Sequence, residues 1–287
     1  MPDAAHPAAL TAVRRRPRLI ATDLDGTVIG YAHTRSGRLS PRTIKALEAA
    51  HDAGIIVVFV TGRPLRWLDA LRDQLGQVGP VICSNGAVVV DPASGQVLRA
   101  HGIDHPVLHS VVDTLRQADP DVSFGVEALE GFFWEADFRA DDPPFEVSMS
   151  TRIEESFERA ETVVKLMAKA PHWDTRDVLQ LTRARVGDVV AVTHSVPGLA
   201  LVEMSAPGVN KASTLERYAA EHGVEAADVV AFGDMPNDLE MLRWAGTGLA
   251  VGSGHELLRA AADGVVGACD DDGVAIAIEH LLTLPAA

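Results

Sequence analysis

Short apolar runs that stop abruptly at polar residues constrain the fold of this chain more than any other sequence feature. In the clearest run, Ile55–Val60, mostly β-branched side chains follow one another without alternation, and Thr61-Gly62-Arg63-Pro64 comes directly after it. A strand with apolar residues on both faces is typical of the interior of a parallel sheet. The runs 18–23 and 80–83 are similar. We therefore expect several buried parallel strands whose carboxyl ends carry polar groups.

Segments with helical patterns separate these runs. Ser40 is suited to cap a helix with Pro41 at its first position, which continues to His51 and ends before Gly54. A second helix is expected over 65–75. After residue 210 the alternation of helix and strand returns, over the segments 211–222, 228–232, 237 onward and 248–251. Such alternation predicts an α/β fold built on a parallel sheet.

The pattern changes in the middle of the chain. Between residues 88 and 201 the expected strands alternate between apolar and polar positions, over 122–127, 131–135, 163–167 and 189–193. Alternation indicates strands with one solvated face, as in antiparallel sheets. We therefore predict an inserted α+β domain over 88–201, a core made of 18–87 and 202–287, and a flexible N-terminal leader over 1–17.

Charge and cysteine content limit the function. The formal net charge of −15 opposes binding to nucleic acid and to anionic membranes, and a phosphorylated substrate would need a local cation. The two cysteines, Cys83 and Cys269, lie far apart and form no metal-binding or disulfide pattern. The leader does not resemble a signal peptide, and no apolar run is long enough to span a bilayer. These features favour a soluble cytoplasmic protein.

Asp23 and Asp25 lie two residues apart at the end of the first expected strand, so both carboxylates can point toward one side. An aspartate is ionised at neutral pH and needs no activating base to act as a nucleophile, but its charge must be masked from a phosphate. Mg²⁺ can provide that masking. We predict Asp23 as nucleophile and Asp25 as general acid and then general base. The alternative is an ordinary polar turn.

Two further loops carry groups suited to phosphate. Thr61 and Gly62 offer a hydroxyl and an unhindered N–H, although turn formation alone explains such a pair. Lys211 begins a helix at the return to the core, where its ammonium can neutralise both Asp23 and a phosphate. A solvated surface lysine is the alternative reading.

Asp234 and Asp238 supply carboxylates after the strand 228–232. Mg²⁺ prefers a few carboxylates completed by water molecules. We predict that Asp23, Asp234 and the backbone carbonyl of Asp25 bind Mg²⁺ directly, and that Asp238 orients its waters. Helix capping by acidic residues is the alternative.

The motifs occur in a recognisable order. They are Asp23-Leu-Asp25-Gly-Thr27, Thr61-Gly62-Arg63-Pro64, Ser84-Asn85-Gly86-Ala87, Gly208-Val-Asn-Lys211 and Phe232-Gly-Asp234-Met-Pro-Asn237-Asp238. Together they resemble the motifs of haloacid dehalogenase-superfamily phosphatases, in particular the Cof-type branch with a IIB cap. The resemblance covers nearly the whole chain except the leader.

The resemblance implies a Rossmann-like core with a mobile α+β cap and a Mg²⁺-dependent phosphatase acting through an aspartyl phosphate on Asp23. It implies Thr61 and Lys211 as phosphate-binding residues, with support from Asn237 and Asp238. Asn85 and Gly86 resemble the substrate-side loop of the family. The segment Tyr31–Arg38 is longer than is usual in this branch, and its role is open.

The expected substrate is a small phosphorylated metabolite, such as a sugar phosphate or a phosphorylated cofactor. Specificity would come from the inserted domain. Five of its residues are candidates to contact the leaving group: Phe132, Phe133, Trp134, Glu135 and Arg139. The alternative is that the aromatic ones form the core of this domain. A phosphomutase or another phosphotransferase fits the same motifs, and a non-catalytic phosphometabolite-binding protein fits less well because Asp23 and Asp25 are both present. The acidic turn argues against a nucleotide-dependent oxidoreductase. The substrate and the oligomeric state are not determined by the sequence.

Overall fold

The computed structural model describes residues 10, 13–34, 36–138, 148–174, 177–193 and 200–286. The chain divides into two compact units. The core unit comprises Met1–Arg99 and Asn210–Ala287, and the inserted unit comprises Ala100–Val209.

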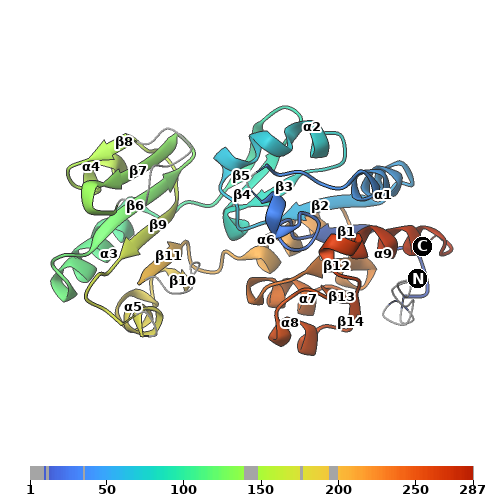
Figure 1. The fold of residues 1–287 in the computed structure, drawn as a ribbon. Helices are drawn as coiled ribbons and strands as arrows, with labels where there is room; N and C mark the ends of the chain where they lie inside the picture. Colours follow the sequence, from blue (N-terminus) through green and yellow to red (C-terminus); the bar gives the residue numbers. More distant parts are fainter. Residues whose placement is uncertain are drawn as a thin grey trace. The chain divides into compact units, whose positions relative to one another are not determined.

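The core unit is built on an eight-stranded sheet with the order β14-β13-β12-β1-β2-β3-β4-β5 (Figure 1). Its strands are β1 (Leu19–Thr22), β2 (Ile56–Val60), β3 (Val81–Cys83), β4 (Val88–Asp91), β5 (Gln96–Ala100), β12 (Val229–Gly233), β13 (Thr247–Val251) and β14 (Gly264–Val266). Neighbouring strands from β14 to β3 pair in parallel, whereas β3 and β4 are antiparallel. The predicted α/β fold with a parallel sheet is confirmed.

Helices cover this sheet. They are α1 (Pro41–Asp52), α2 (Arg72–Leu75), α6 (Lys211–Glu221), α7 (Leu239–Trp244), α8 (Glu256–Ala261) and α9 (Gly273–Leu282). Apolar residues of α6, α7 and α8 pack against Leu19 and Ala21 of β1 and their neighbours in one buried cluster. Helix α1 packs against α9 and β2. Within the described residues, no helix has both the length and the apolar character needed to cross a membrane.

The first helix forms as predicted, whereas the second does not. Ser40 caps α1 by accepting a hydrogen bond from the Thr43 N–H at 3.0 Å. The helix predicted over 65–75 is wrong as a single element, because Leu65–Trp67 and Asp69–Leu71 form 3₁₀ turns before α2 begins. Leu68 and Leu71 are both buried. A 3₁₀ turn places residues three apart on the same side, so this tighter winding directs both side chains inward.

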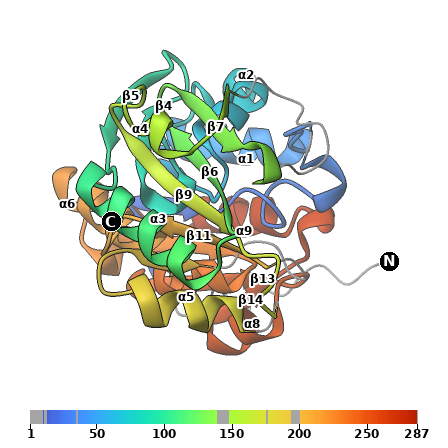
Figure 2. The same cartoon turned by 90° about the vertical axis from the view of Figure 1, so that its left-hand side faces the viewer.

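The inserted unit contains a six-stranded sheet with the order β10-β11-β9-β6-β7-β8. Its strands are β6 (Ser123–Ala128), β7 (Gly131–Glu135), β8 (Ser148–Ser150), β9 (Val163–Lys169), β10 (Ala191–Thr193) and β11 (Leu201–Ser205), and its helices are α3 (His105–Ala118), α4 (Glu154–Phe157) and α5 (Val178–Val186). All the pairs are antiparallel except β7 with β8. Helices α3 and α5 lie against each other and share one buried cluster with β6 and β9 (Figure 2).

The limits of the inserted unit differ from the expected range 88–201. Strand β4 pairs with β3 and β5 follows it in the large sheet, so residues 88–99 extend the core unit. Strand β11 pairs with β9 and β10, so residues 202–209 belong to the inserted unit. Pairing between neighbouring strands therefore places the division at 99/100 and 209/210.

Candidate active site

Three parallel strands bring the predicted polar residues to one edge of the core sheet. Thr22 of β1 pairs in register with Phe232 of β12 and Phe59 of β2. The next residue, Asp23, donates its backbone N–H to the Phe232 carbonyl at 3.0 Å. Thr61 comes directly after β2, and Asp234 directly after β12. Because the strands run in the same direction, their carboxyl ends meet and form one polar site.

Lys211 links the carboxylates of this site. Its Nζ lies 2.6 Å from Asp23 Oδ1 and 2.6 Å from Asp238 Oδ1. Its side chain is only 2% exposed, so both ion pairs are shielded from water. Asn210 caps helix α6 by accepting a hydrogen bond from the Ser213 N–H at 2.8 Å, which places Lys211 at the first helical position. The alternative of a solvated surface lysine is therefore wrong.

Asp238 combines two roles at the loop after β12. Its Oδ2 accepts hydrogen bonds from the backbone N–H groups of Asp234 and Met235, each at 3.0 Å. Its Oδ1 faces Lys211. The carboxylate is fully buried. Asp238 thus caps the local backbone, as the simpler reading held, and also holds the buried ammonium.

The buried charges change one another's protonation. Burial raises the pKa of Asp23 well above its ordinary value, since Lys211 only partly offsets it and the charges of Asp238 and Asp234 add to it. Burial also raises the pKa of Asp234, to about 6. Burial alone would lower the pKa of Lys211, but Asp23 and Asp238 outweigh it and raise that pKa. The site therefore holds more negative charge than one lysine compensates.

This excess charge fits a divalent cation. Asp23, Asp234 and Asp238 are all buried, and each offers a carboxylate oxygen within 4.8 Å of the others. Three carboxylates face one ammonium, and an oxygen-only donor set is the kind that Mg²⁺ prefers. The residues present therefore fit the predicted metal.

Asp25 is oriented differently from the other predicted acidic residues. Arg63 donates from Nε to Asp25 Oδ2 and from Nη2 to Asp25 Oδ1, each at 2.6 Å. The same Nη2 donates to the Thr34 carbonyl at 2.7 Å. The Arg63 side chain is 4% exposed. A two-pronged pair of this kind fixes the plane of the carboxylate as well as its position.

The segment after the first motif reaches the acidic cluster. Tyr31, in the 3₁₀ turn Tyr31–His33, donates its hydroxyl to Asp234 Oδ2. Burial and Asp234 raise the pKa of Tyr31. Gly26 has a φ of +81°, and a Cβ there would collide with Asp234 Oδ2 and the Tyr31 ring. Only glycine leaves room for this close approach.

The other predicted phosphate-binding residues lie in the turns that follow β2, β3 and β12. Thr61 Oγ1 accepts a hydrogen bond from the Arg63 N–H at 3.1 Å, as the turn alternative expected. Asn85 has a φ of 55° and lies beside Gly62. Its Oδ1 accepts from Asn237 Nδ2 at 3.3 Å. The structure therefore brings Thr61, Gly62, Asn85 and Asn237 together in the core unit.

The candidate specificity residues on β7 have structural contacts. Phe132 and Trp134 pack with Phe138 and Met167 in one apolar cluster, and Phe133 packs in the main core of the inserted unit. Glu135 pairs with Arg116 and accepts backbone hydrogen bonds from the N–H groups of Phe124 and Ile153 at 2.9 and 2.8 Å. Arg139 lies outside the described residues. The aromatic residues therefore belong to the buried core of the inserted unit, which was the alternative to a role in specificity.

Two residues of the site were not assigned a role from the sequence. Arg63 directly follows Thr61-Gly62, and this adjacency to a strand end was the available signal. Tyr31 stood in the unusually long segment after the first motif, but no spacing rule indicated contact with Asp234, which is 203 positions away.

Comparisons with known proteins give consistent results. A family model described as haloacid dehalogenase-like hydrolase matches residues 20–278. The HMP-PP phosphatase of Yersinia enterocolitica is 28% identical, with 93% of this chain and 96% of the relative covered. The pyridoxal phosphate phosphatase YbhA of Escherichia coli is 29% identical, with 92% and 99% covered. The solved HAD subclass IIB sugar phosphatase BT4131 shares the fold, with a TM-score of 0.72, 22% identity and coverage of 92% and 98%.

Proposed function

The chain belongs to the haloacid dehalogenase-like hydrolase family, and on that premise we propose that it hydrolyses a small phosphorylated metabolite through an aspartyl phosphate on Asp23. The sequence-based identification of the family and the assignment to the phosphoric monoester hydrolases are confirmed.

One observation carries the mechanism: the buried ammonium of Lys211 lies 2.6 Å from Asp23 Oδ1. A nucleophilic carboxylate must meet a phosphate dianion, and the two repel each other strongly in a buried site. Lys211 reduces the repulsion and can remain in contact with Asp23 as the phosphate arrives. Its second partner, Asp238, keeps it in place.

In the first step, an Asp23 oxygen forms a bond to phosphorus while the bond from phosphorus to the leaving oxygen breaks. Asp25 in its protonated form gives that oxygen a proton. In the second step, water attacks phosphorus, the bond to Asp23 breaks, and Asp25 takes the proton from the water. The pairing with Arg63 fixes the direction of the Asp25 carboxylate, and one of its two hydrogen bonds must open before that oxygen carries the proton.

We assign direct metal binding to Asp23 and Asp234, with the predicted Asp25 carbonyl as a further ligand, and place Asp238 beside them. When bound, Mg²⁺ supplies positive charge that offsets the carboxylates and the phosphate oxygens. Asp238 contacts the protein with both oxygens, which supports its role in orienting metal-bound water.

Phosphate recognition is assigned to the turns that follow β2, β3 and β12. Thr61 and Gly62 would offer a hydroxyl and an N–H to the phosphate oxygens. Asn85 and Asn237 hold each other at 3.3 Å and would contact the oxygens or the leaving group. The inserted unit, Ala100–Val209, would select the leaving group as a cap.

The relatives suggest the class of substrate. Their names give HMP-PP and pyridoxal phosphate as substrates, and a third protein of the same fold is a sugar phosphatase. We propose a phosphorylated cofactor, a precursor of one, or a sugar phosphate, acted on in the cytoplasm.

The test is phosphate release and covalent labelling with p-nitrophenyl phosphate. Asp23→Asn should abolish both signals, and chelation of Mg²⁺ should abolish them reversibly. The control is Asp263→Asn, the same substitution at another aspartate of the core unit. Asp263 accepts a hydrogen bond from the Gly248 N–H and is not part of the site. Undiminished labelling of Asp23→Asn would refute the aspartyl phosphate. A screen of phosphorylated metabolites would then identify the substrate.

A further inference from the structure

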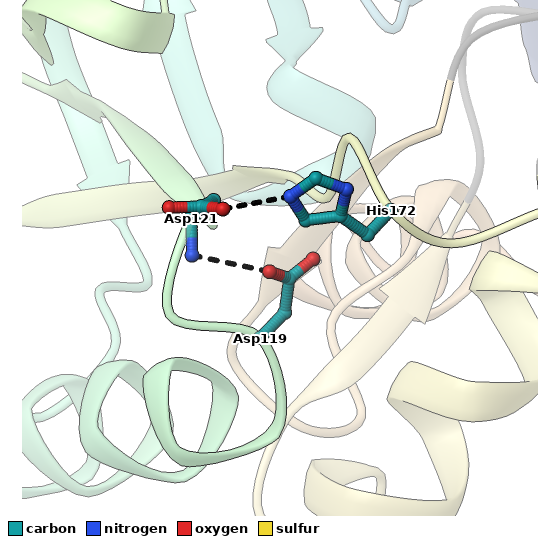
Figure 3. Close-up of side chains that lie close together, drawn as sticks. All are labelled: Asp119, Asp121 and His172. Carbon is teal, nitrogen blue, oxygen red and sulfur yellow. Dashed lines mark hydrogen bonds and ion pairs between the residues drawn. The ribbon is translucent and has the colours of Figure 1, made fainter.

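We propose that Asp119, Asp121 and His172 of the inserted unit form a binding site for a divalent cation of the Zn²⁺ type. Each residue offers one ligand atom within 4.8 Å of the other two. Figure 3 shows the three side chains converging, with the carboxylate of Asp119 directed toward His172 and Asp121. This site is separate from the acidic cluster of the core unit.

The sheet of the inserted unit explains why these residues meet. Strands β6 and β9 are antiparallel neighbours, and Ser123 pairs in register with Lys169. Asp121 lies just before the first of these residues, and His172 lies just after the second. His172 Nε2 and Asp121 Oδ2 are 2.7 Å apart. Pairing of the two strands thus brings the turn before β6 and the turn after β9 together.

Asp119 provides an independent sign that this cluster suits a cation. Its side chain is 3% exposed, and its Oδ1 accepts a hydrogen bond from the Asp121 N–H at 3.1 Å. Its Oδ2 is buried and has no hydrogen-bond partner among the described residues. A buried, unpaired carboxylate oxygen is costly unless a cation or a donor compensates it.

The position of Asp119 on its helix increases this cost. Asp119 is the C-cap of α3, a helix of 14 residues. The carboxyl end of a helix carries partial negative charge and favours cations, so an aspartate there is on the unfavourable side. The partial charge of the helix end and the carboxylates of Asp119 and Asp121 are all negative and lie close together. A bound metal ion would compensate this negative charge.

Two protein groups could compensate the charge without a metal. A protonated His172 pairs with Asp121, and Lys169 lines the same pocket as both residues. Within the described part of the chain, however, neither group makes an ion pair or a hydrogen bond with Asp119 Oδ2. The charge of Asp119 acts on His172 through space, but the buried Oδ2 has no direct hydrogen-bond partner among the described residues, and this observation favours the metal.

The donor set indicates the kind of cation. One imidazole and two carboxylates suit Zn²⁺ or a similar transition metal better than Mg²⁺, which prefers oxygen ligands only. Asp121 and His172 line a pocket of about 880 Å³ in the inserted unit, and their side chains are 72% and 64% exposed. A cation can therefore reach the site from solvent, and three protein ligands leave positions open for water or for an oxygen of a ligand.

Zn²⁺ titration of the full chain tests the proposal, with excess Mg²⁺ present to occupy the acidic cluster of the core unit. Wild type should bind Zn²⁺ at a site whose affinity falls about tenfold or more in Asp119→Asn and in His172→Ala. Asp137→Asn is the matched control, because Asp137 is an exposed residue of the same pocket outside the cluster, and it should bind as wild type does. Co²⁺ in place of Zn²⁺ should give a visible absorption band that His172→Ala loses.

Thermal unfolding gives a readout that does not depend on measured affinity. Zn²⁺ should raise the melting temperature of wild type but not that of Asp119→Asn. The proposal is overturned if Zn²⁺ binds Asp119→Asn and wild type equally, or if Asp137→Asn loses as much affinity as Asp119→Asn.

Discussion

Arg63 holds Asp25 by two hydrogen bonds of 2.6 Å, so the proposed acid/base residue is paired with a buried guanidinium. The same guanidinium donates to the Thr34 carbonyl and thereby ties the segment after the first motif to Asp25. Asp25 follows β1, but the residue that holds it, Arg63, lies in the turn after β2.

Replacing Arg63 should therefore reduce turnover. Arg63→Lys keeps the charge but loses the planar fork, so we expect kcat to fall about tenfold to a hundredfold with a smaller change in KM. Initial rates of phosphate release measure both constants. The control is Arg38→Ala, an exposed arginine of the neighbouring segment, which should leave kcat unchanged. Equal kcat in Arg63→Lys and wild type would show that the pairing does not position Asp25.

Removing Lys211 should destabilise the core unit. Lys211→Met leaves Asp23 and Asp238 buried without their ammonium, which costs about 3–5 kcal/mol in the free energy of unfolding. Urea unfolding in the absence of metal measures this loss. Lys45→Met, at an exposed position of α1, should change it by less than about 0.5 kcal/mol. Adding Asp238→Asn to Lys211→Met should recover part of the loss, and an additive double variant would contradict the coupling.

The raised pKa of Asp234 predicts a pH-dependent stability. Burial is the main cause of its value of about 6, against an ordinary value of 3.8. The folded protein therefore binds more protons than the unfolded chain between these values, so the free energy of unfolding falls as pH rises through this window. For Asp234 alone the loss is at most about 3 kcal/mol. Asp23, whose pKa is also raised, acts in the same direction.

Urea unfolding across pH 4–7, in the presence of a chelator, measures this loss. The free energy of unfolding should fall more steeply with pH in wild type than in Asp234→Asn, which lacks the titrating group. Excess Mg²⁺ should reduce it by compensating the ionised carboxylates. Identical pH profiles for the two proteins would show that Asp234 is not the titrating group.

Two glycines provide a matched test of the packing around Asp234. Gly26 and Gly54 both have a φ of +81°, but a Cβ would collide with Asp234 Oδ2 only at Gly26, while Gly54 has open space. Gly54→Ala should cost about 1–2 kcal/mol from backbone strain alone. Gly26→Ala should cost clearly more and should also lower phosphatase activity, because it displaces Asp234 or Tyr31. Calorimetry and phosphate release distinguish the two variants, and equal losses of stability would rule out the collision.

The strand-end residues could be predicted from the sequence for a physical reason. A run such as Ile55–Val60 is apolar on both faces and therefore belongs inside a parallel sheet, whose strands all end at one edge. The convergence of Asp23, Thr61 and Asp234 follows from that geometry. Lys211 could be added because the alternation of helix and strand resumes there.

Other features depend on contacts that no local pattern encodes. The pairing of Asp25 with Arg63 and the contact of Tyr31 with Asp234 are set by how loops pack after the strands have assembled. The segment 65–75 carries leucines at a spacing that both an α-helix and successive 3₁₀ turns can bury. The limits of the inserted unit were missed because β4 adds antiparallel to a parallel sheet, which apolar content does not reveal.

The place of β1 between β2 and β12 also affects how the protein is made. Strand β2 lies close to β1 along the chain, but β12 begins at Val229, after the whole inserted unit. During synthesis, β1 therefore emerges with one edge unpaired and keeps it exposed until most of the polypeptide has left the ribosome. The nascent chain is vulnerable to aggregation over that interval, and the site around Asp23 can form only near the end of translation.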